Sequence, residues 1–368
     1  MASQLEIKLQ QRIQVETDVS QRASFNAELA CYLARTGDFE RADDIRSELR
    51  RQFGNGSSLV VSVRLMVLEG LLMYYKDLNP SARDRILRAN LLSNSFHELG
   101  LIALTSAWLA HIDFNRCNFQ SMVSEIRKCM TVIDHDDGTA LCRVSLVLGD
   151  SFLHCGDRES SQVWYEKARL IATDLGDQAA IGAITYNRAA LNVQNLRLRA
   201  TRGAVRSEEV ERVRMELKTA INYQNLARLK SLDHLLRAAT VSLHIMSGEY
   251  DAAIMEASNL VDSRLAPEGS GEHLLLLSDL AICYASLGDL ESALRFGSQV
   301  VSAVDSCIDE DDLAIIFSSL AESAKRVGKN DLLIHYNSRA SQAISNHDSE
   351  VAKLNRSLDE FRSGSPLT

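Results

Sequence analysis

Proline is scarce in this sequence, which leaves helices free to form almost everywhere. Only three prolines occur in 368 residues, at positions 80, 267 and 366. Because proline is the strongest helix breaker, nearly the whole chain can be helical. Aromatic residues make up only 6% of the chain, and β-branched runs with a period of two are hard to find. These features predict an all-α fold.

Long apolar runs and a positive net charge are also missing. No run approaches the roughly 18 to 20 apolar residues that a bilayer span requires, and the N-terminus MASQLEIKLQQRIQ has no apolar core of a signal peptide. We therefore expect a soluble, cytoplasmic protein with no membrane partner. The formal net charge of −9 gives no overall attraction to phosphate backbones. Nucleic acid is not expected as a partner either.

Paired cysteines and catalytic motifs are absent too. The seven cysteines are scattered singly with no C-x-x-C pair, so we expect buried, reduced thiols. His154 and Cys155 are adjacent, but neighbouring helical residues point about 100° apart and cannot chelate a metal alone. The acidic segment 134–138 is interpreted as a helix cap and not as a calcium loop. We predict no catalytic residues, no metal and no cofactor.

What the sequence has instead is a repeat. Gly248, Gly288 and Gly328 are spaced evenly (288 − 248 = 40 and 328 − 288 = 40). The equivalent positions in the N-terminal half are Gly37, Asp77, Cys117 and, one residue early, Gly156. A bulky apolar residue and then a small one follow most of these positions, as Leu290 and Ala293 follow Gly288.

Each copy of the repeat predicts two antiparallel helices. The glycine ends the first helix in a left-handed conformation. Small residues seven positions earlier allow the helices to approach closely, and they are Gly70, Ala110, Gly149, Ala281 and Ala321. Ala293 has the matching place on a second helix. Because one such pair cannot bury its apolar stripe alone, successive pairs must stack into an array.

This pattern resembles the tetratricopeptide repeat (TPR) family. Tyr284, Gly288, Leu290 and Ala293 match the family's small, aromatic and glycine positions, and GDSFLHCGDRESSQVWYEKA is a second matching segment. The repeat is longer than the family's usual length of about 34 residues, and the consensus Trp and Pro are missing. The resemblance implies a right-handed α-solenoid of about eight antiparallel helix pairs, with long repeats as in bacterial regulatory proteins.

The repeat also predicts the domain organisation. Residues 1–18 are expected to form an N-terminal capping helix and residues 20–345 the repeat array. Residues 346–368 are expected to form a C-terminal capping helix and a tail. The gap between Gly156 and Gly248 exceeds two repeats, and the surplus is placed in an inserted loop at about 197–206.

The resemblance implies that the first helices of successive repeats line a concave groove. Counting back from the loop positions predicts these groove residues: Arg64, His111, Asn115, Arg143, Asp150, His154, Tyr186, Asn187 and Gln194. Two interpretations stay open, a partner-binding groove and a solvated helix surface. The Lys and Asn pair with which some family members grip a C-terminal carboxylate is absent, since Ala107 and His111 occupy matching positions.

The predicted inserted loop is basic, with Arg197, Arg199, Arg202 and Arg206. Arginine can receive a carboxylate or a phosphate through two parallel hydrogen bonds. The alternative is a mobile loop that its charge keeps soluble.

The function that follows is a non-enzymatic scaffold that binds a protein or peptide in its groove, within bacterial regulation. The alternative is a ligand-sensing TPR module of a signalling or transcription-regulatory system. A third class is a hydrolase or transferase that uses the array as a substrate platform. The identity of the partner and homodimerisation stay open.

Overall fold

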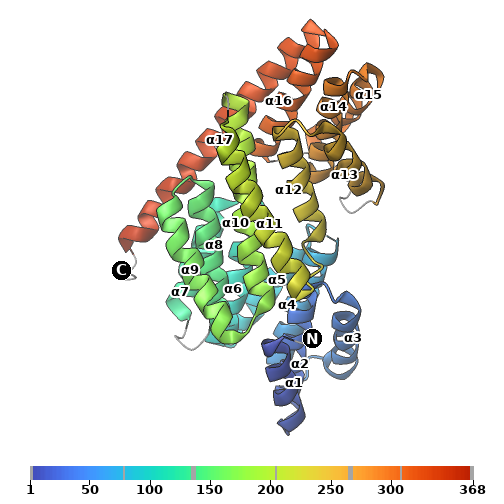
Figure 1. Ribbon diagram of the computed structural model, residues 1–368. Helices are drawn as coiled ribbons and strands as arrows, with labels where there is room; N and C mark the ends of the chain where they lie inside the picture. The colour runs from blue at the N-terminus through green and yellow to red at the C-terminus, as the bar shows by residue number, and fades with distance from the viewer. Residues whose placement is uncertain are drawn as a thin grey trace. The chain divides into compact units, whose positions relative to one another are not determined.

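The computed structural model describes residues 3–77, 79–133, 138–203, 205–263, 268–306 and 309–364. Seventeen α-helices and one short 3₁₀-helix make up the secondary structure, and no β-strand occurs within these ranges (Figure 1). The predicted all-α fold is confirmed. Within the same ranges, no helix has both the length and the apolar character needed to cross a membrane.

The chain divides into two compact units. Unit 1 comprises residues 1–185, 223–231 and 354–368, and unit 2 comprises residues 186–222 and 232–353. The helices of unit 1 are α1 (Gln4–Val15), α2 (Val19–Thr36), α3 (Phe39–Phe53), α4 (Leu59–Asp77), α5 (Ala82–Ser95), α6 (Leu99–Phe114), α7 (Phe119–Val132), α8 (Gly138–His154) and α9 (Arg158–Leu175). Those of unit 2 are α12 (Asp233–Met246), α13 (Tyr250–Asp262), α14 (Gly271–Leu287), α15 (Leu290–Ala303), the 3₁₀-helix η1 (Val304–Ser306) and α16 (Glu310–Val327). Three helices contribute residues to both units: α10 (Gln178–Arg202), α11 (Ser207–Ala227) and α17 (Asn330–Gly364).

Residues with a left-handed backbone conformation separate the two helices of a repeat, as the spacing predicts. Gly288 ends α14 with φ 86°, a conformation that costs other residues a steric penalty. Asp289 then caps α15 by accepting a hydrogen bond from the Ser292 amide at 3.1 Å. Cys117 stands at an equivalent position and adopts φ 53° despite its side chain. The turn geometry is therefore kept at Cys117 without a glycine, whereas Asp77, another predicted turn position, is the last residue of helix α4.

The small residues before these turns bring the paired helices into close contact. A Cβ atom added to Gly70 on α4 would lie 2.5 Å from Ile86 Cγ1 on α5. One added to Gly149 on α8 would lie 2.8 Å from the ring of Tyr165 on α9. Since real Cβ atoms do not approach other atoms so closely, a larger residue would force the helices apart. The prediction of close packing at these positions is confirmed.

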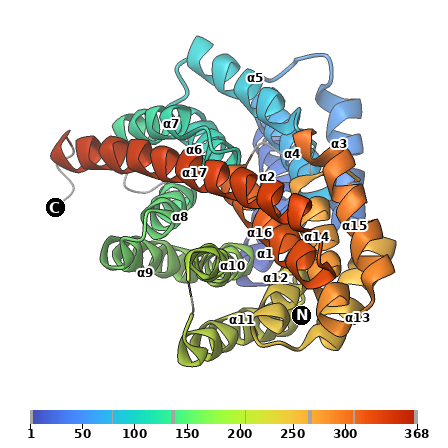
Figure 2. The ribbon, with the colours of Figure 1, turned by 90° about the horizontal axis from the view of Figure 1, so that it is seen from above.

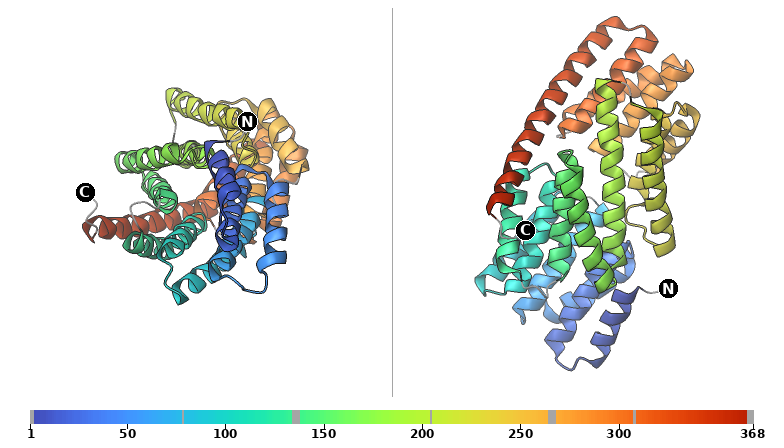
Figure 3. Two further views of the ribbon diagram at one scale, coloured as in Figure 1. Left: turned by 90° about the horizontal axis from the view of Figure 1, so that it is seen from below. Right: turned by 60° about the vertical axis from the view of Figure 1, so that its left-hand side comes forward.

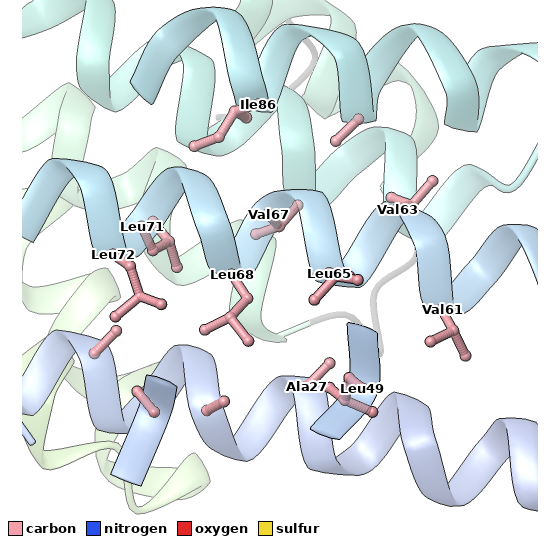
Figure 4. Packing of buried hydrophobic residues seen from close by; sticks show 14 of the residues in the cluster. Ala27, Leu49, Val61, Val63, Leu65, Val67, Leu68, Leu71, Leu72 and Ile86 are labelled. Atoms are coloured by element: carbon pink, nitrogen blue, oxygen red, sulfur yellow. The ribbon is translucent and has the colours of Figure 1, made fainter. Parts of the chain in front are cut away.

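In unit 1 the helix pairs stack in sequence order. Helix α2 packs against α4, and α6 packs against α8 (Figure 2). Within the pairs, α8 lies beside α9, as the right-hand view of Figure 3 shows. Figure 4 shows how α4 is buried on two sides, with Leu68 and Leu72 pointing toward α2 and Ile86 pointing toward α4 from α5. The apolar stripe of each pair is thus covered by its neighbours.

Unit 2 repeats this arrangement. Its helices pack in the sequence α12 to α13, α13 to α14, and α14 to both α15 and α16. One core cluster joins Leu277, Val300 and Phe317 from three of these helices. A second joins residues of α10, α11 and α12, including Val193, Leu217 and Leu236.

The N-terminal capping helix was predicted at 1–18, and α1 lies inside these bounds. Leu9 of α1 is only 1% exposed and joins the core of unit 1. The amide of Leu5 donates a hydrogen bond to the carbonyl of Gly176 at 3.3 Å. Helix α1 therefore contacts the turn between α9 and α10 as well as α2.

Two predicted boundaries are wrong. The inserted loop at 197–206 is helical up to Arg202, because α10 continues for 25 residues. The separate C-terminal capping helix at 346–368 is instead the end of α17, which runs for 35 residues. Neither α10 nor α17 contains a proline, and α17 has no glycine before Gly364. Without a helix breaker the backbone hydrogen bonds continue.

We predict that Ala293→Leu destabilises the protein. Ala293 on α15 is 2% exposed, and α15 packs against α14. Extra methylene groups at such a contact typically cost about 1 to 3 kcal/mol. Thermal and urea unfolding of the variant provide the measurement. The matched control is Glu291→Leu at an exposed position of the same helix, and equal stability of the two variants would show that the helix contact is not at Ala293.

Candidate functional site

The inner faces of α2, α4, α6 and α8 surround a cavity of about 620 Å³ in unit 1. Successive lining residues on each helix are mostly three or four apart, which places them on one helix face. The lining residues of these four helices include Glu28, Cys31, Arg35, Arg64, Val67, Leu71, Leu104, Trp108, Cys142 and Arg143. Asp177 and Ala180 complete the wall near the start of α10.

An ion pair joins the two ends of this wall. The Arg35 guanidinium lies 2.8 Å from the Asp177 carboxylate, and the two side chains are only 9% and 5% exposed. Burial alone would lower the pKa of Arg35, but the charge and the hydrogen bond of Asp177 outweigh it and raise that pKa. Asp177 also caps α10 by accepting a hydrogen bond from the Ala180 amide at 2.9 Å. Both ionised groups are therefore satisfied.

Arg64 has a weaker partner in the same cavity. Its Nη1 lies 3.6 Å from the Glu28 carboxylate, and its Nε is buried without a hydrogen-bond partner although the side chain is only half-buried. The separation exceeds the 2.7–2.9 Å typical of a charge-assisted hydrogen bond. Part of the hydrogen-bonding capacity of Arg64 is therefore unused.

Arg143 is held against an aromatic ring. Its guanidinium carbon lies 3.9 Å from the centroid of the Trp108 ring, which is a cation–π contact. The residue is 5% exposed, and its Nη1 is buried without a hydrogen-bond partner. Within the described residues no carboxylate forms an ion pair with it. Trp108 thus fixes a buried cation whose hydrogen bonds are incomplete.

His111 lies behind this contact and not in the cavity wall. Its ring packs edge-on against Trp108, with centroids 5.6 Å apart. Its Nε2 lies 3.4 Å from the Tyr74 hydroxyl, and its Nδ1 is buried without a partner. Burial and the nearby charge of Arg143 both lower the pKa of His111 well below its ordinary value. The imidazole is therefore neutral near pH 7.

The structure places the predicted groove residues in different environments, and only some of them line the cavity. Arg64 and Arg143 line the unit 1 cavity. Asn115 is exposed at the end of α6 and donates a hydrogen bond to the Tyr74 hydroxyl at 2.6 Å. Asp150 is fully buried and accepts a hydrogen bond from the Tyr165 hydroxyl at 2.7 Å. His154 packs against Phe119 at a centroid distance of 5.6 Å.

Solvent exposure was therefore predicted wrongly for three of these residues. His111, Arg143 and Asp150 were expected on a solvent-facing surface, but all three are buried. Their contacts come from aromatic residues on the same or a neighbouring helix, namely Trp108 and Tyr165. Of the two aromatic residues, Tyr165 donates a hydrogen bond to Asp150, whereas Trp108 only packs against Arg143 and His111.

Sequence reasoning also missed residues that build the cavity. Trp108 follows Leu101 and Leu104 at spacings of three and four, so the shared helix face was a readable signal. The pairing of Arg35 with Asp177 had no such signal, because the two residues lie in different repeats far apart in sequence.

Unit 2 contains a smaller cavity of about 230 Å³ with an acidic lining. Tyr186 and Gln194 line it, as do Glu272 and Asp312. Gln194 donates a hydrogen bond to Asp311 at 2.7 Å, while Asn187 is half-buried on α10. Burial raises the pKa of Glu272 to about 7, and burial with nearby carboxylates raises that of Asp312.

The four arginines of the predicted basic loop already have carboxylate partners. Arg197 binds Asp279 through two hydrogen bonds, of 2.5 and 3.2 Å. Arg199 lies 3.1 Å from Glu209, and Arg206 lies 3.8 Å from the same carboxylate. Arg202 lies 2.6 Å from Asp348. The pairs of Arg197, Arg199 and Arg202 connect α10 to α14, α11 and α17 within unit 2, whereas Arg206 lies just before α11 and its pair is local to that helix.

Within the described residues, no group of three or more His, Cys, Asp or Glu side chains is arranged to hold a metal ion. Residues 134–137 of the acidic segment interpreted as a helix cap lie outside the described residues, and α8 begins at Gly138.

No protein-family model matches the chain, and no curated protein matches it. Its fold is similar to the crystal structure of a Rap protein complexed with competence and sporulation factor. The TM-score is 0.59 and the sequence identity 11%, over 94% of this chain and 94% of that chain. This likeness confirms the predicted fold class, an all-α solenoid of TPR-like helix pairs.

We predict that His111 makes the folded state less stable in mild acid. The pKa of His111 is lowered by folding, so below about pH 6.5 the unfolded chain binds a proton that the folded chain does not. The contribution of His111 to the free energy of unfolding therefore falls as the pH falls, by up to about 1.4 kcal/mol per pH unit. Urea unfolding from pH 7.5 to 5.5 should show a smaller loss of stability for His111→Gln than for the native protein. His335→Gln, at an exposed position of α17, is the matched control, and parallel curves for native protein and His111→Gln would contradict the prediction.

Proposed function

We propose that this protein is a non-enzymatic helical-repeat scaffold that binds a peptide, or an extended segment of a protein partner, in the unit 1 cavity. The observation that carries this proposal is the position of the cavity on the inner faces of α2, α4, α6 and α8. These are the first helices of successive repeats, the helices to which the TPR resemblance assigns partner binding.

The size and lining of the cavity suit a short chain segment. Its volume of about 620 Å³ falls within the ~300–1,000 Å³ range of small-ligand sites. Val67, Leu71 and Leu104 supply apolar wall, while Arg64 and Arg143 supply hydrogen-bond donors. A peptide offers both apolar side chains and acceptor groups, so it can use both kinds of surface.

The likeness to a Rap protein supports the same conclusion at the level of the fold. That structure is of a complex with competence and sporulation factor, so a helical array of this class can receive another molecule. We extend the proposal to a regulatory protein of the bacterial cytoplasm with long TPR-like repeats.

The state of the cavity cysteines favours binding over catalysis. Burial raises the pKa of Cys31 to about 12 and that of Cys142 to about 11, although nearby arginines oppose the rise. Both side chains are therefore thiols near pH 7, and the thiolate is the nucleophilic form. The Arg35 and Asp177 charges are also engaged with each other, which leaves no carboxylate of that pair free for acid–base work.

We predict that filling the cavity weakens partner binding at least about tenfold. Leu104 is half-buried in the wall, so Leu104→Trp adds bulk where the partner would lie. Protein from a lysate of the source cells would be captured on native and variant protein and quantified by mass spectrometry. A genuine partner should be recovered at least about tenfold less on the variant, a loss equivalent to about 1.4 kcal/mol.

The matched control for this experiment is Leu170→Trp. Leu170 on α9 is 65% exposed and does not line the cavity. Thermal melts establish that both variants are folded. Recovery of the same partners in equal amounts on native protein and Leu104→Trp would place binding elsewhere and refute the proposal.

A further inference from the structure

Arg143 is a charged group of the unit 1 cavity whose hydrogen bonds are not all made. Its side chain lines the cavity, it is 5% exposed, and its buried Nη1 has no hydrogen-bond partner. Leaving a buried donor of a charged group unsatisfied is costly, because its hydration is lost without replacement. The contact with Trp108 at 3.9 Å stabilises the charge but accepts no hydrogen bond.

A second arginine in the same wall shares this property. Arg64 Nε is buried without a partner, and Glu28 lies 3.6 Å from its Nη1. Arg35, by contrast, is satisfied by Asp177 at 2.8 Å. The cavity therefore contains one complete arginine–carboxylate pair and two arginines with unused donors.

We propose that the ligand of the unit 1 cavity presents a carboxylate group, which Arg143 binds with the help of Arg64. This inference rests on the proposed function and names the chemical group that the site recognises. A carboxylate can accept two parallel hydrogen bonds from the planar guanidinium. Trp108 holds that plane in place, so less side-chain freedom is lost when the ligand binds.

The other charges in the cavity favour a carboxylate over a phosphate. Glu28 and the exposed Glu98 line the same cavity, and each would repel a dianion more strongly than a single negative charge. Leu71 and Leu104 add apolar wall to the same cavity, and such a surface offers no compensation for the lost hydration of a dianion. A monoanion next to an apolar side chain matches this lining. A peptide supplies it as its C-terminal carboxylate or as an Asp or Glu side chain.

The test uses the full-length protein and three pools of N-acetylated random pentapeptides. The first pool has a free C-terminus and no Asp or Glu. The second is amidated at the C-terminus and contains one Asp or Glu, and the third is amidated and contains neither. Affinity selection with mass spectrometry identifies the retained peptides. Their dissociation constants are then measured from Trp108 fluorescence in a Trp164→Phe background, because the chain has only two tryptophans.

Matched arginine variants show whether Arg143 is responsible. We expect Arg143→Gln to weaken the carboxylate peptides by about tenfold to a hundredfold, as expected for loss of a charge-assisted hydrogen bond. Arg143→Lys keeps the positive charge but lacks the planar guanidinium, so its affinity for these peptides should lie between those of the native protein and Arg143→Gln. Arg295→Gln is the control, since the exposed Arg295 stacks 4.8 Å from the Phe296 ring in unit 2 and should leave the affinity unchanged.

The outcomes separate this inference from the proposed function. Preferential retention of the first pool identifies a C-terminal carboxylate, and retention of the second identifies an acidic side chain. Equal retention of the third pool, which has no carboxylate, overturns the carboxylate inference but leaves peptide binding standing. Retention of no pool overturns both. The pool comparison uses native protein, so it decides the question even if the Arg143 variants do not fold.

Discussion

The buried ion pair between Arg35 and Asp177 is the contact on which the unit 1 cavity depends. Arg35 lies near the end of α2 and Asp177 at the start of α10, so the pair joins the first helix of the cavity wall to the last. The backbone beside it is fixed as well, because the Ser231 hydroxyl donates to the Arg35 carbonyl at 2.7 Å and the Lys230 amide to the Thr36 carbonyl at 2.9 Å. Removing one partner from a buried pair typically costs about 3 to 5 kcal/mol. The shape of the cavity is therefore set by an electrostatic contact as much as by apolar burial.

The close packing of the helix pairs explains why charged side chains collect in this cavity. Gly70 and Gly149 let each pair bury its apolar stripe against its own partner and its neighbours. The remaining face of each first helix points inward, where the array leaves space that water or a ligand can enter. Arginine suits that face, because its aliphatic stem packs against apolar wall while its guanidinium reaches a carboxylate or an aromatic ring. Arg35 and Arg143 represent these two solutions.

The repeat was predictable from sequence because it depends on local rules. Gly288, Ala293 and their equivalents act through backbone conformation and contact distance within one repeat, and the structure confirms them. The lengths of α10 and α17 were not predicted, because the repeat spacing indicated breaks there although no helix breaker interrupts either helix. At the site, Arg64 and Arg143 were predicted to face a partner-binding groove, and in the structure both line the unit 1 cavity. The burial of Arg143 and the partner of Arg35 were missed, since both depend on contacts between residues of different repeats.

The same difference in partners separates Arg35 and Arg197 from Arg143, which we propose as the group that recognises the ligand. Arg35 and Arg197 each have a carboxylate of their own chain within hydrogen-bonding distance, so an incoming anion would have to displace it. Among the described residues Arg143 contacts the face of Trp108 and no carboxylate, so an incoming anion would have no carboxylate to displace there. A buried arginine left without a carboxylate is unfavourable for folding, because its desolvation is only partly compensated. In the carboxylate recognition that we propose, that cost is offset when the ligand supplies the hydrogen bonds that the folded chain omits, so it contributes to the affinity for an anion of matching shape.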